Sequence, residues 1–347
     1  MQLLPTRLVN SGPIEGLGRL QAELALRQKE LSTGRKADVG LEAGSEIRRN
    51  LALKSSISEI DAYQRLNGTA ASRLGGAQSA LSSIAKAAGN FLSDGIPARD
   101  APNARFLMGQ AASNGLTDMN RALNTQIGGF PVFGGQSLDA LPMKDFAGAE
   151  GAPARAAIDA AFQGQFGFGV IDPQAANLSA ADMKTFFNGP FSALFEHANW
   201  GALWSNASDT PMSAEIAPGI TAETSATTHL KGIQDLAKGY VALSYFKDKP
   251  VSDSAFKGLI DASLSSTGVA RGGLVAAQAN LGLAEERVSN ANDRLGDMEM
   301  VFSRSLNGLE ATDPFDVAAR INTLLTGIEA SYAMTARLQR LSLINFL

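Results

Sequence analysis

The sequence predicts a mainly α-helical protein with an α+β insert, in which long antiparallel helices from both chain ends form a coiled-coil rod and the middle of the chain forms an outer domain. Three observations predict this fold class. Apolar residues near both ends recur at helical spacing, glycine and aromatic residues cluster between them, and the final segment "RLQRLSLINFL" is apolar to its last residue. Chain termini usually fray in water, so an apolar terminus indicates a surface that packs against protein.

Composition argues against several functional classes. The chain has 347 residues, of which 45% are apolar and 18% charged, which is enough for a buried core and more than one domain. A net charge of −4 provides no basic surface for nucleic acid. The absence of cysteine excludes a disulfide framework, thiolate catalysis and cysteine metal sites. No apolar run has the length of a membrane span or of a signal peptide, so we expect neither a membrane partner nor a cleaved signal.

The N-terminal part of the chain predicts three helices. The first ends at "STGRKADVG", and its apolar face carries Ile14, Leu17, Leu24 and Leu31. The second runs from about 43 to 92, and its apolar face is interrupted by Gln64, Asn67 and Gln78. Buried polar groups of this kind can fix helix register at a cost in stability. The third, about 103–127, ends at "NTQIGGFPVFGGQS", whose paired glycines must turn the chain.

The middle of the chain, 138–255, has a different composition. Glycine and phenylalanine cluster in "FQGQFGFGV", and both tryptophans, Trp200 and Trp204, lie here. The segment "PMSAEIAPGITAETSAT" alternates around Pro218-Gly219, which predicts two short strands joined by a tight turn. A helix is expected at 226–246. We therefore interpret this region as an α/β insert.

A long helix with a coiled-coil pattern is predicted over 274–309. Its length would be about 54 Å at the usual rise per residue. The nearby charges fall off its apolar seam, whose spacing alternates between three and four residues with one polar exception. The seam consists of Leu274, Ala277, Leu281, Ala284, Val288, Ala291, Leu295, Met298, Phe302, Ser305 and Leu309. Such a helix needs a partner along its whole length.

This helix is expected to stop within "NGLEATDPFD". Asp313 then has the position of an N-cap residue and Pro314 that of the first helical residue. A calcium loop is the alternative for this acidic turn, although the spacing of an EF-hand is missing. A final helix follows and continues to the C-terminus.

The sequence contains no recognisable catalytic motif. His197 and His229 stand in separate contexts without zinc-helix spacing, and we interpret both as packed or surface histidines. The glycines of "GQFGFG" lack the residues of a phosphate loop, and the Gly-x-Ser-x-Gly elbow of hydrolases is missing. A carboxylate pair of the glycosidase type stays open. We expect no enzyme activity, no cofactor and no metal.

Both ends of the chain resemble the flagellin-like axial proteins of the bacterial flagellum. The most specific likeness lies in "NDRLGDMEMVFSRSLNGLEATDPFDVAARINTLLTGIEASYAMTARLQRLSLINFL", and "LSTGRKADVG" and "LNTQIGGFPVFGG" support it. Within this family the segments are most similar to the hook-associated proteins of the distal hook–filament junction. The Asn-Thr-Asn start that is common in flagellins is missing, which argues against the main filament subunit.

The resemblance implies a structural role. It implies an adaptor at the hook–filament junction that polymerises through its terminal helices and templates flagellin assembly, with flagellar type III export to the extracellular flagellum. The implied partners are further copies of the chain, a proximal hook-associated protein, flagellin and an export chaperone. Four domains are expected. Residues 1–40 form an N-terminal helical segment ordered by assembly, and 41–137 form the long helices of the rod and its helix-to-sheet turn. Residues 138–255 form the outer insert, and 256–347 form the C-terminal coiled-coil helices.

The candidate assembly residues are the large apolar side chains of the terminal helices. Burying an exposed Leu, Ile or Phe contributes about 1.5–3 kcal/mol, whereas ordering one residue costs about 1–2 kcal/mol, so the whole seam must cooperate with lateral contacts. Folding of the ends and polymerisation are then one event. The candidates are Leu17, Leu24, Leu31, Leu281, Val288, Leu295, Met298, Phe302, Leu309, Ile321, Leu324, Ile328, Leu338, Leu341, Ile344, Phe346 and Leu347.

Three alternatives to the junction adaptor stay open. A divergent flagellin would form the filament itself. An enzyme carried on a helical scaffold would need a polar cluster in the insert, and the sequence singles none out. A cytoplasmic coiled-coil signalling protein is disfavoured by the apolar C-terminus.

Overall fold

The computed structural model describes residues 6–37 and 47–344, with side chains from 15 to 37 and from 47 to 337. The chain divides into two compact units. The terminal unit comprises Met1–Asp61 and Gly296–Leu347, and the central unit comprises Ala62–Leu295. Helices dominate the described residues, whose strands form two short antiparallel hairpins. The predicted mainly α-helical fold with a small β insert is therefore confirmed.

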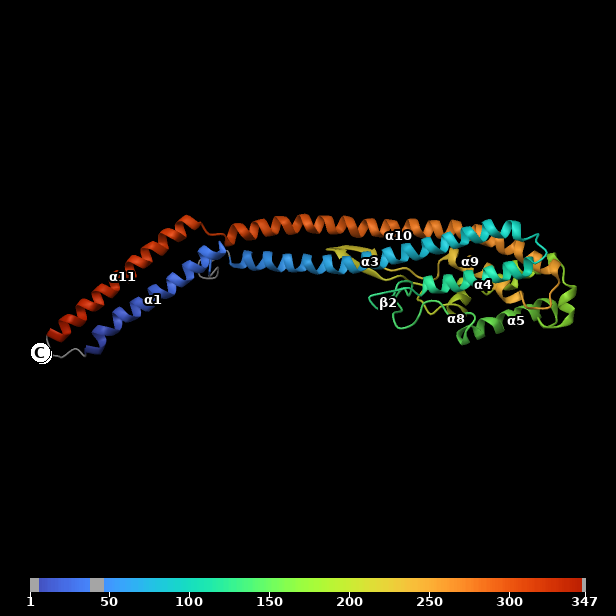
Figure 1. Cartoon of the computed structure of the whole chain (residues 1–347), viewed down its shortest axis with the longest axis horizontal. Coiled ribbons are helices and arrows are strands. Elements are labelled where there is room, and N and C mark those ends of the chain that lie inside the picture. Colours follow the sequence, from blue (N-terminus) through green and yellow to red (C-terminus); the bar gives the residue numbers. More distant parts are fainter. Residues whose placement is uncertain (1–5, 38–46, 345–347) are drawn as a thin grey trace. The chain divides into compact units, whose positions relative to one another are not determined.

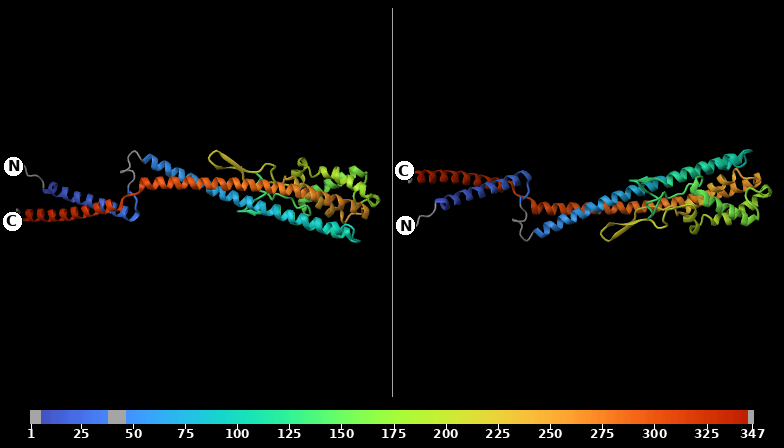
Figure 2. Two further views of the ribbon diagram at one scale, coloured as in Figure 1. Left: turned by 90° about the horizontal axis from the view of Figure 1, so that it is seen from above. Right: turned by 90° about the horizontal axis from the view of Figure 1, so that it is seen from below.

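Two antiparallel helices from opposite ends of the sequence form most of the terminal unit. They are α1 (Thr6–Thr33) and α11 (Pro314–Ile344), which lie side by side in Figures 1 and 2. A hydrogen bond of 3.1 Å from Gln21 Nε2 to the Tyr332 hydroxyl joins them. The same unit contains the beginning of α3 (Ile47–Ala98) and the end of α10 (Asp253–Glu310).

Local signals determine where these terminal helices end and begin. Gly34 follows α1 with a φ of 67°, a left-handed conformation that favours glycine, and its N–H donates to the Glu30 carbonyl at 2.8 Å. At the start of α11, the Asp313 carboxylate accepts the Phe315 N–H at 2.8 Å. The predicted N-cap at Asp313, with Pro314 as the first helical residue, is therefore confirmed.

The central unit contains four long helical segments, which belong to α3, α4 (Ala104–Leu123), α9 (Lys231–Phe246) and α10. The helix expected at 103–127 ends earlier than predicted, because Thr125 and the residues after it enter the hairpin of β1 (Gln126–Ile127) and β2 (Phe130–Pro131). Gly128 and Gly129 make its turn with positive φ. The helix expected at 226–246 begins at Lys231.

The seam of α10 is buried in the central unit. Val288, Ala291 and Leu295 are each at most 1% exposed, and Leu274, Ala277 and Leu281 are also buried. The helix is antiparallel to α3, since Gly89 faces Arg271 and Gly75 faces Glu285. It begins 21 residues before the predicted start, at Asp253 rather than 274.

The insert is more helical than the sequence predicted. Its helices are α5 (Ala152–Phe166), α6 (Ala180–Asn188), α7 (Pro190–Ala193) and α8 (His197–Leu203), with short 3₁₀ turns at Ala149–Gly151 and Pro173–Asn177. Aromatic side chains form its core, and the ring centroids of Phe195 and Trp204 lie 4.3 Å apart. The predicted hairpin is confirmed as β3 (Ser213–Ala217) and β4 (Ile220–Glu223). Gly219 turns the chain with a φ of 72°.

One of the polar residues predicted on the face of α3 joins three elements. Asn67 is 1% exposed. Its Nδ2 donates to the Asn292 Oδ1 on α10 at 2.8 Å and to the Ile216 carbonyl on β3 at 2.7 Å. This amide therefore fixes the register of α3 against α10 and holds β3 close to the turn of the β3–β4 hairpin.

Replacing Asn67 with alanine should lower the free energy of unfolding by about 1–3 kcal/mol, because both acceptors lose their donor in a buried site. Chemical denaturation followed by circular dichroism measures the change. Ser72→Ala on the exposed face of α3 is the matched control, and its effect should stay within about 0.5 kcal/mol. Equal stability of the two variants would contradict the role given to Asn67.

Candidate assembly surfaces

The contact face between α1 and α11 contains several of the predicted assembly residues. Leu324 and Ile328 of α11 are buried, and Ile321 is half-buried. On α1, Leu17 and Leu24 are half-buried. These side chains pack within one chain. Their part in contacts between copies stays a prediction.

The other faces of the same two helices expose large apolar side chains. Phe315 is 84% exposed and Met334 is 68% exposed, although both are apolar. A pair of helices can bury only one face of each helix, so the remaining apolar residues stay in water unless another molecule covers them. The exposed set comprises Leu26, Leu31, Phe315, Leu325 and Met334. Tyr332 is also 53% exposed, but its hydroxyl accepts the bond from Gln21 of α1.

The seam of α10 changes at the boundary of the terminal unit. Leu281, Val288 and Leu295 are buried in the central unit, where α3 and the β3–β4 hairpin meet α10 at Asn67, Ile216 and Asn292. Beyond Leu295 the terminal unit contains the first turns of α3 and the end of α10, and Met298 is 42% exposed there. Phe302 and Leu309 are half-buried. The predicted residues of this stretch are therefore partly available to a partner.

The last part of the predicted set falls beyond the described side chains. Leu338, Leu341 and Ile344 belong to α11, but the structure describes no side chain there. Phe346 and Leu347 lie outside the described residues. The assignment of these five residues to an interface stays a prediction.

A buried carboxylate connects the segments that meet at the end of α10. Glu310, the last residue of this helix, is 3% exposed. Its carboxylate lies 2.6 Å from the Lys54 Nζ and 3.4 Å from the Arg35 guanidinium, and it accepts the Asn50 amide at 2.9 Å. We call Glu310, Arg35, Asn50 and Lys54 the Glu310 cluster. It links the residues that follow α1, the first turns of α3 and the end of α10.

Backbone hydrogen bonds reinforce this cluster. The Lys36 N–H donates to the Glu310 carbonyl at 2.8 Å, and the Thr312 N–H donates to the Gly34 carbonyl at 3.2 Å. Arg35 and Ala311 form an antiparallel bridge. Nearby, the buried Glu30 carboxylate accepts the Ala37 N–H at 2.9 Å and pairs with Arg27 at 2.8 Å. The turn after α1 is therefore held by two buried carboxylates.

The surroundings of Glu310 favour its charged form. Hydrogen bonds from Lys54 and then Asn50 lower the pKa of the Glu310 carboxyl below its ordinary value, and they outweigh the opposing effect of burial. Glu310 is not among the residues predicted from the sequence. A signal was present, since a carboxylate at the C-terminal end of a helix opposes the helix dipole and needs compensation from cations.

The two histidines of the chain lie close together in the central unit, although the sequence analysis treated them separately. Their ring centroids are 5.2 Å apart, and the His197 Nε2 lies 3.5 Å from Asp209. Both line a pocket of about 320 Å³. Burial lowers the pKa of His229, whose Nε2 contacts the Ala207 carbonyl at 3.2 Å. Within the described residues, no three His, Asp or Glu side chains are placed to hold a metal ion.

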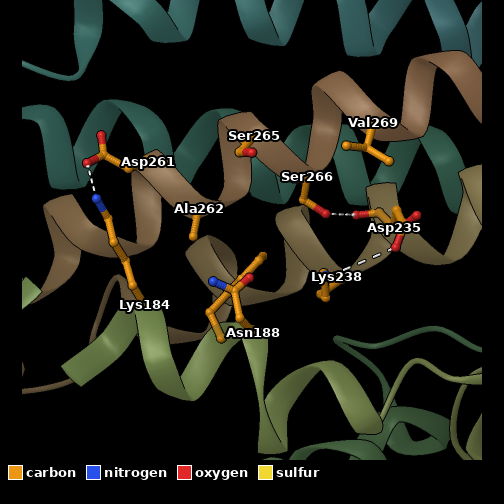
Figure 3. A pocket seen from close by; sticks show the side chains of 10 residues that line it. Lys184, Asn188, Asp235, Lys238, Asp261, Ala262, Ser265, Ser266 and Val269 are labelled. Carbon is orange, nitrogen blue, oxygen red and sulfur yellow. Dashed lines mark hydrogen bonds and ion pairs between the residues drawn. The ribbon is translucent and has the colours of Figure 1, made fainter. Parts of the chain in front are cut away.

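A second pocket of the central unit, of about 360 Å³, is lined by charged side chains from α6, α9 and α10 (Figure 3). Lys184 pairs with Asp261 at 2.8 Å, and Asp235 pairs with Lys231 at 2.7 Å and faces Lys238 at 4.0 Å. Each carboxylate thus has a cationic partner. The Lys184–Asp261 pair ties α6 to α10, whereas both Asp235 pairs lie within α9, which is joined to α10 by the Ser266 hydroxyl donating to the Asp235 carbonyl at 2.8 Å. A structural role therefore accounts for these charges.

A groove between α3 and α4 has a volume of about 470 Å³. Its lining is mostly apolar, and Tyr240 of α9 lies at its floor. Ile96, Phe106 and Leu107, at the adjoining ends of the two helices, are exposed.

In the part of the chain that the structure describes, no helix is long and apolar enough to cross a membrane.

Comparisons with known proteins agree with this arrangement. A family model described as the bacterial flagellin N-terminal helical region matches residues 13–137, and the model of the bacterial flagellin C-terminal helical region matches residues 264–347. Together they match more than half of the chain. No curated protein matches the sequence.

Two solved structures are similar to the chain. A protein described as a flagellar hook-associated protein from Vibrio parahaemolyticus matches with a TM-score of 0.52 and 11% identity, over 78% of this chain and 99% of that chain. FlgL of Bacillus cereus matches with a TM-score of 0.49 and 10% identity, over 74% of this chain and 98% of that chain. At this identity the first likeness shows the fold alone.

Proposed function

Since the chain belongs to the bacterial flagellin family of structural flagellar proteins, we propose that it is an adaptor at the hook–filament junction. In this role it polymerises through its terminal helices and templates the assembly of flagellin. The fold is similar to that of a protein described as hook-associated, which is compatible with this role.

The observation that carries the proposal is the exposed apolar surface of α1 and α11. Phe315, Leu325 and Met334 lie in water in the single chain, and burying a side chain of this size contributes about 1.5–3 kcal/mol. In an isolated chain the exposed surface of these side chains contributes no free energy of burial. An assembly in which neighbouring chains cover them gains from each one, so polymerisation stabilises the terminal unit.

The proposed partners follow from this position. The chain contacts further copies of itself, a proximal hook-associated protein on the hook side and flagellin on the filament side. A flagellar export chaperone protects it before it leaves the cell by flagellar type III export. The ion pairs of the charged pocket serve stability, and we propose no catalytic activity, no cofactor and no nucleic-acid partner.

Deletion of the gene, with imaging of the cell surface, tests the adaptor role. Cells should carry hooks without filaments and should shed flagellin into the medium, and the intact gene should restore filaments. Normal filaments in the deletion strain would contradict the proposal.

A divergent flagellin is the second candidate, because both matching family models describe the helical regions of flagellin itself. A flagellin would polymerise alone into long filaments. The adaptor should instead form short assemblies or none, and should seed the growth of added flagellin. Electron microscopy of the purified chain distinguishes these outcomes.

Limited proteolysis tests the proposal that assembly orders the terminal helices. In the purified single chain, trypsin should remove residues of α1 and α11 first, since cleavable side chains such as Lys29 and Arg320 lie exposed on helices with one covered face. Fragments containing the central unit, Ala62–Leu295, should resist. Mass spectrometry identifies them. Termini that resist as long as the central unit would argue against assembly-coupled ordering.

A further inference from the structure

The central unit carries a mostly apolar groove that none of the residues described by the structure fills. Ala87, Phe91 and Gly95 of α3 line one wall, and Leu107, Ala111 and Gly115 of α4 line the other. The walls extend over Ala87–Ala98 and Leu107–Asp118, a length of about 17 Å at the usual helical rise. This length fits about three turns of another helix.

The floor of the groove contains a polar group without a partner. Tyr240 is 1% exposed, and its hydroxyl has no hydrogen-bond partner among the described residues. A Cβ at Gly115 would lie 2.8 Å from the Tyr240 ring, so glycine is what lets α4 pass so closely over the ring. A buried hydroxyl without a partner is costly, and an occupant of the groove that bonds to it would remove that cost.

One end of the groove is suited to a cation. Asp118 lines the groove beside Tyr240, and its present partner, Arg121, forms an exposed pair in which both side chains are more than half exposed. Exposed pairs of this kind contribute little, so Asp118 can accept a different cation. The phenol oxygen and the carboxylate together offer acceptors to a guanidinium group.

The opposite face of α10 has the complementary pattern. Turned away from its buried seam, the helix exposes a charge-free stripe with alternating spacings of three and four residues. We call this the α10 stripe, and it consists of Val269, Gly272, Ala276, Ala279 and Leu283. Arg287 follows one turn later on the same face, is exposed, and has no ion pair within the described residues. The stripe spans about 21 Å.

We propose that the α10 stripe of one copy lies in the α3–α4 groove of the next copy, with Arg287 reaching Asp118 and the Tyr240 hydroxyl. The groove and the stripe are different surfaces of one molecule, so the contact is head-to-tail and continues from copy to copy. Small residues on the stripe let the helix sink between α3 and α4. The inference rests on the proposed function only in requiring that the chain polymerises.

The direction of the helices is consistent with copies that point the same way. Within one chain α10 is antiparallel to α3, and Gly89 is level with Arg271. If the neighbouring copy points in the same direction, its α10 is also antiparallel to α3 of the first copy. This orientation places Leu283 and Arg287 of the neighbour at the end of the groove that contains Asp118. Bringing the stripe level with the groove then shifts neighbouring copies by about 13 Å along the helices. A shift of this kind generates a helical path.

Cysteine cross-linking tests the contact directly, because the natural chain has no cysteine. Ala111→Cys lies in the groove and Ala279→Cys on the stripe, and both positions are exposed. Oxidation of full-length chains carrying both substitutions should give a ladder of covalent oligomers. A mixture of the two single variants should give dimers, while each single variant should give few. Ala160→Cys on the exposed face of α5, combined with Ala279→Cys, is the matched control.

The outcomes separate this contact from the alternatives. Dimers of Ala279→Cys alone would show that two stripes pack against each other and would overturn the proposal, as would the absence of the Ala111–Ala279 ladder. A charge exchange tests the register: Arg287→Glu should reduce assembly at least tenfold, and adding Asp118→Arg should restore it. If cross-linking fails while the gene deletion still removes filaments, this contact is wrong and the adaptor role stands.

Discussion

Replacing Glu310 with alanine should increase the population of chains with an opened terminal unit by about ten- to hundredfold. The substitution removes the acceptor of Lys54, Arg35 and Asn50 at the point where three chain segments meet. A hydrogen bond to a charged group contributes about 1.5–3 kcal/mol, and the exposed ends of Lys54 and Arg35 can return to water, which keeps the loss within that range. Hydrogen exchange of the amides in α1 and α11 measures the opening.

The central unit should be unaffected by this substitution, since none of its described residues belongs to the cluster. Glu286→Ala, which removes an exposed carboxylate from the same helix, is the matched control and should leave the exchange of α1 and α11 unchanged. Equal protection in Glu310→Ala and in the natural chain would show that the cluster does not hold the terminal unit.

The same residue makes the terminal unit sensitive to acid. The folded pKa of Glu310 lies below its ordinary value of 4.5, so the unfolded segment binds the proton more readily than the folded one. The stabilisation is complete above pH 4.5 and is lost as pH falls through the folded pKa. Hydrogen exchange should therefore accelerate in the natural chain on acidification, and this acceleration should be smaller in Glu310→Ala.

The second large effect concerns assembly. Leu325→Glu should lower the association constant of the chain by at least about a thousandfold, because burying an unpaired carboxylate costs several kcal/mol in addition to the lost apolar contact. Leu325 is 42% exposed in the single chain, so the variant should fold normally. Light scattering of the purified chain and counting of filaments on complemented cells measure the effect.

Leu325→Met is the control, since it keeps the volume and the apolar character of the side chain. This variant should assemble and restore filaments. If Leu325→Glu also assembles normally, the exposed face of α11 is free surface in the flagellum and the proposed role of the terminal helices loses its main support.

The sequence predicted those features that depend on neighbouring residues. Gly34 and Asp313-Pro314 mark helix ends through local backbone geometry, and Pro218-Gly219 marks a hairpin turn in the same way. The seam of α10 was predicted because its period extends over many turns. These local sequence signals do not depend on which distant segment packs against the helix or hairpin.

The features that the sequence did not predict depend on contacts between distant segments. The early part of α10 escaped prediction because it is rich in small residues, which the structure explains: Gly273 lies so close to Gly232 of α9 that a Cβ would be 2.9 Å from the Gly232 Cα. Glu310 meets Arg35 across most of the sequence, and His197 meets His229 only because the insert folds back on itself. The pattern of residues along a sequence does not show which distant residues come into contact.

The β3–β4 hairpin offers a place for foreign sequence. Its tip, Pro218-Gly219, is exposed, and a Cβ at Gly219 would meet nothing within 4 Å. Its base is secured separately, because the Thr224 N–H donates to the Met212 carbonyl at 2.8 Å and the Met212 N–H donates to the Ser225 hydroxyl at 2.8 Å. Lengthening a loop costs only about 0.6 kcal/mol for each doubling. A peptide epitope inserted at the tip should therefore be tolerated and remain accessible to antibodies, which would allow each copy to be labelled and counted on living cells.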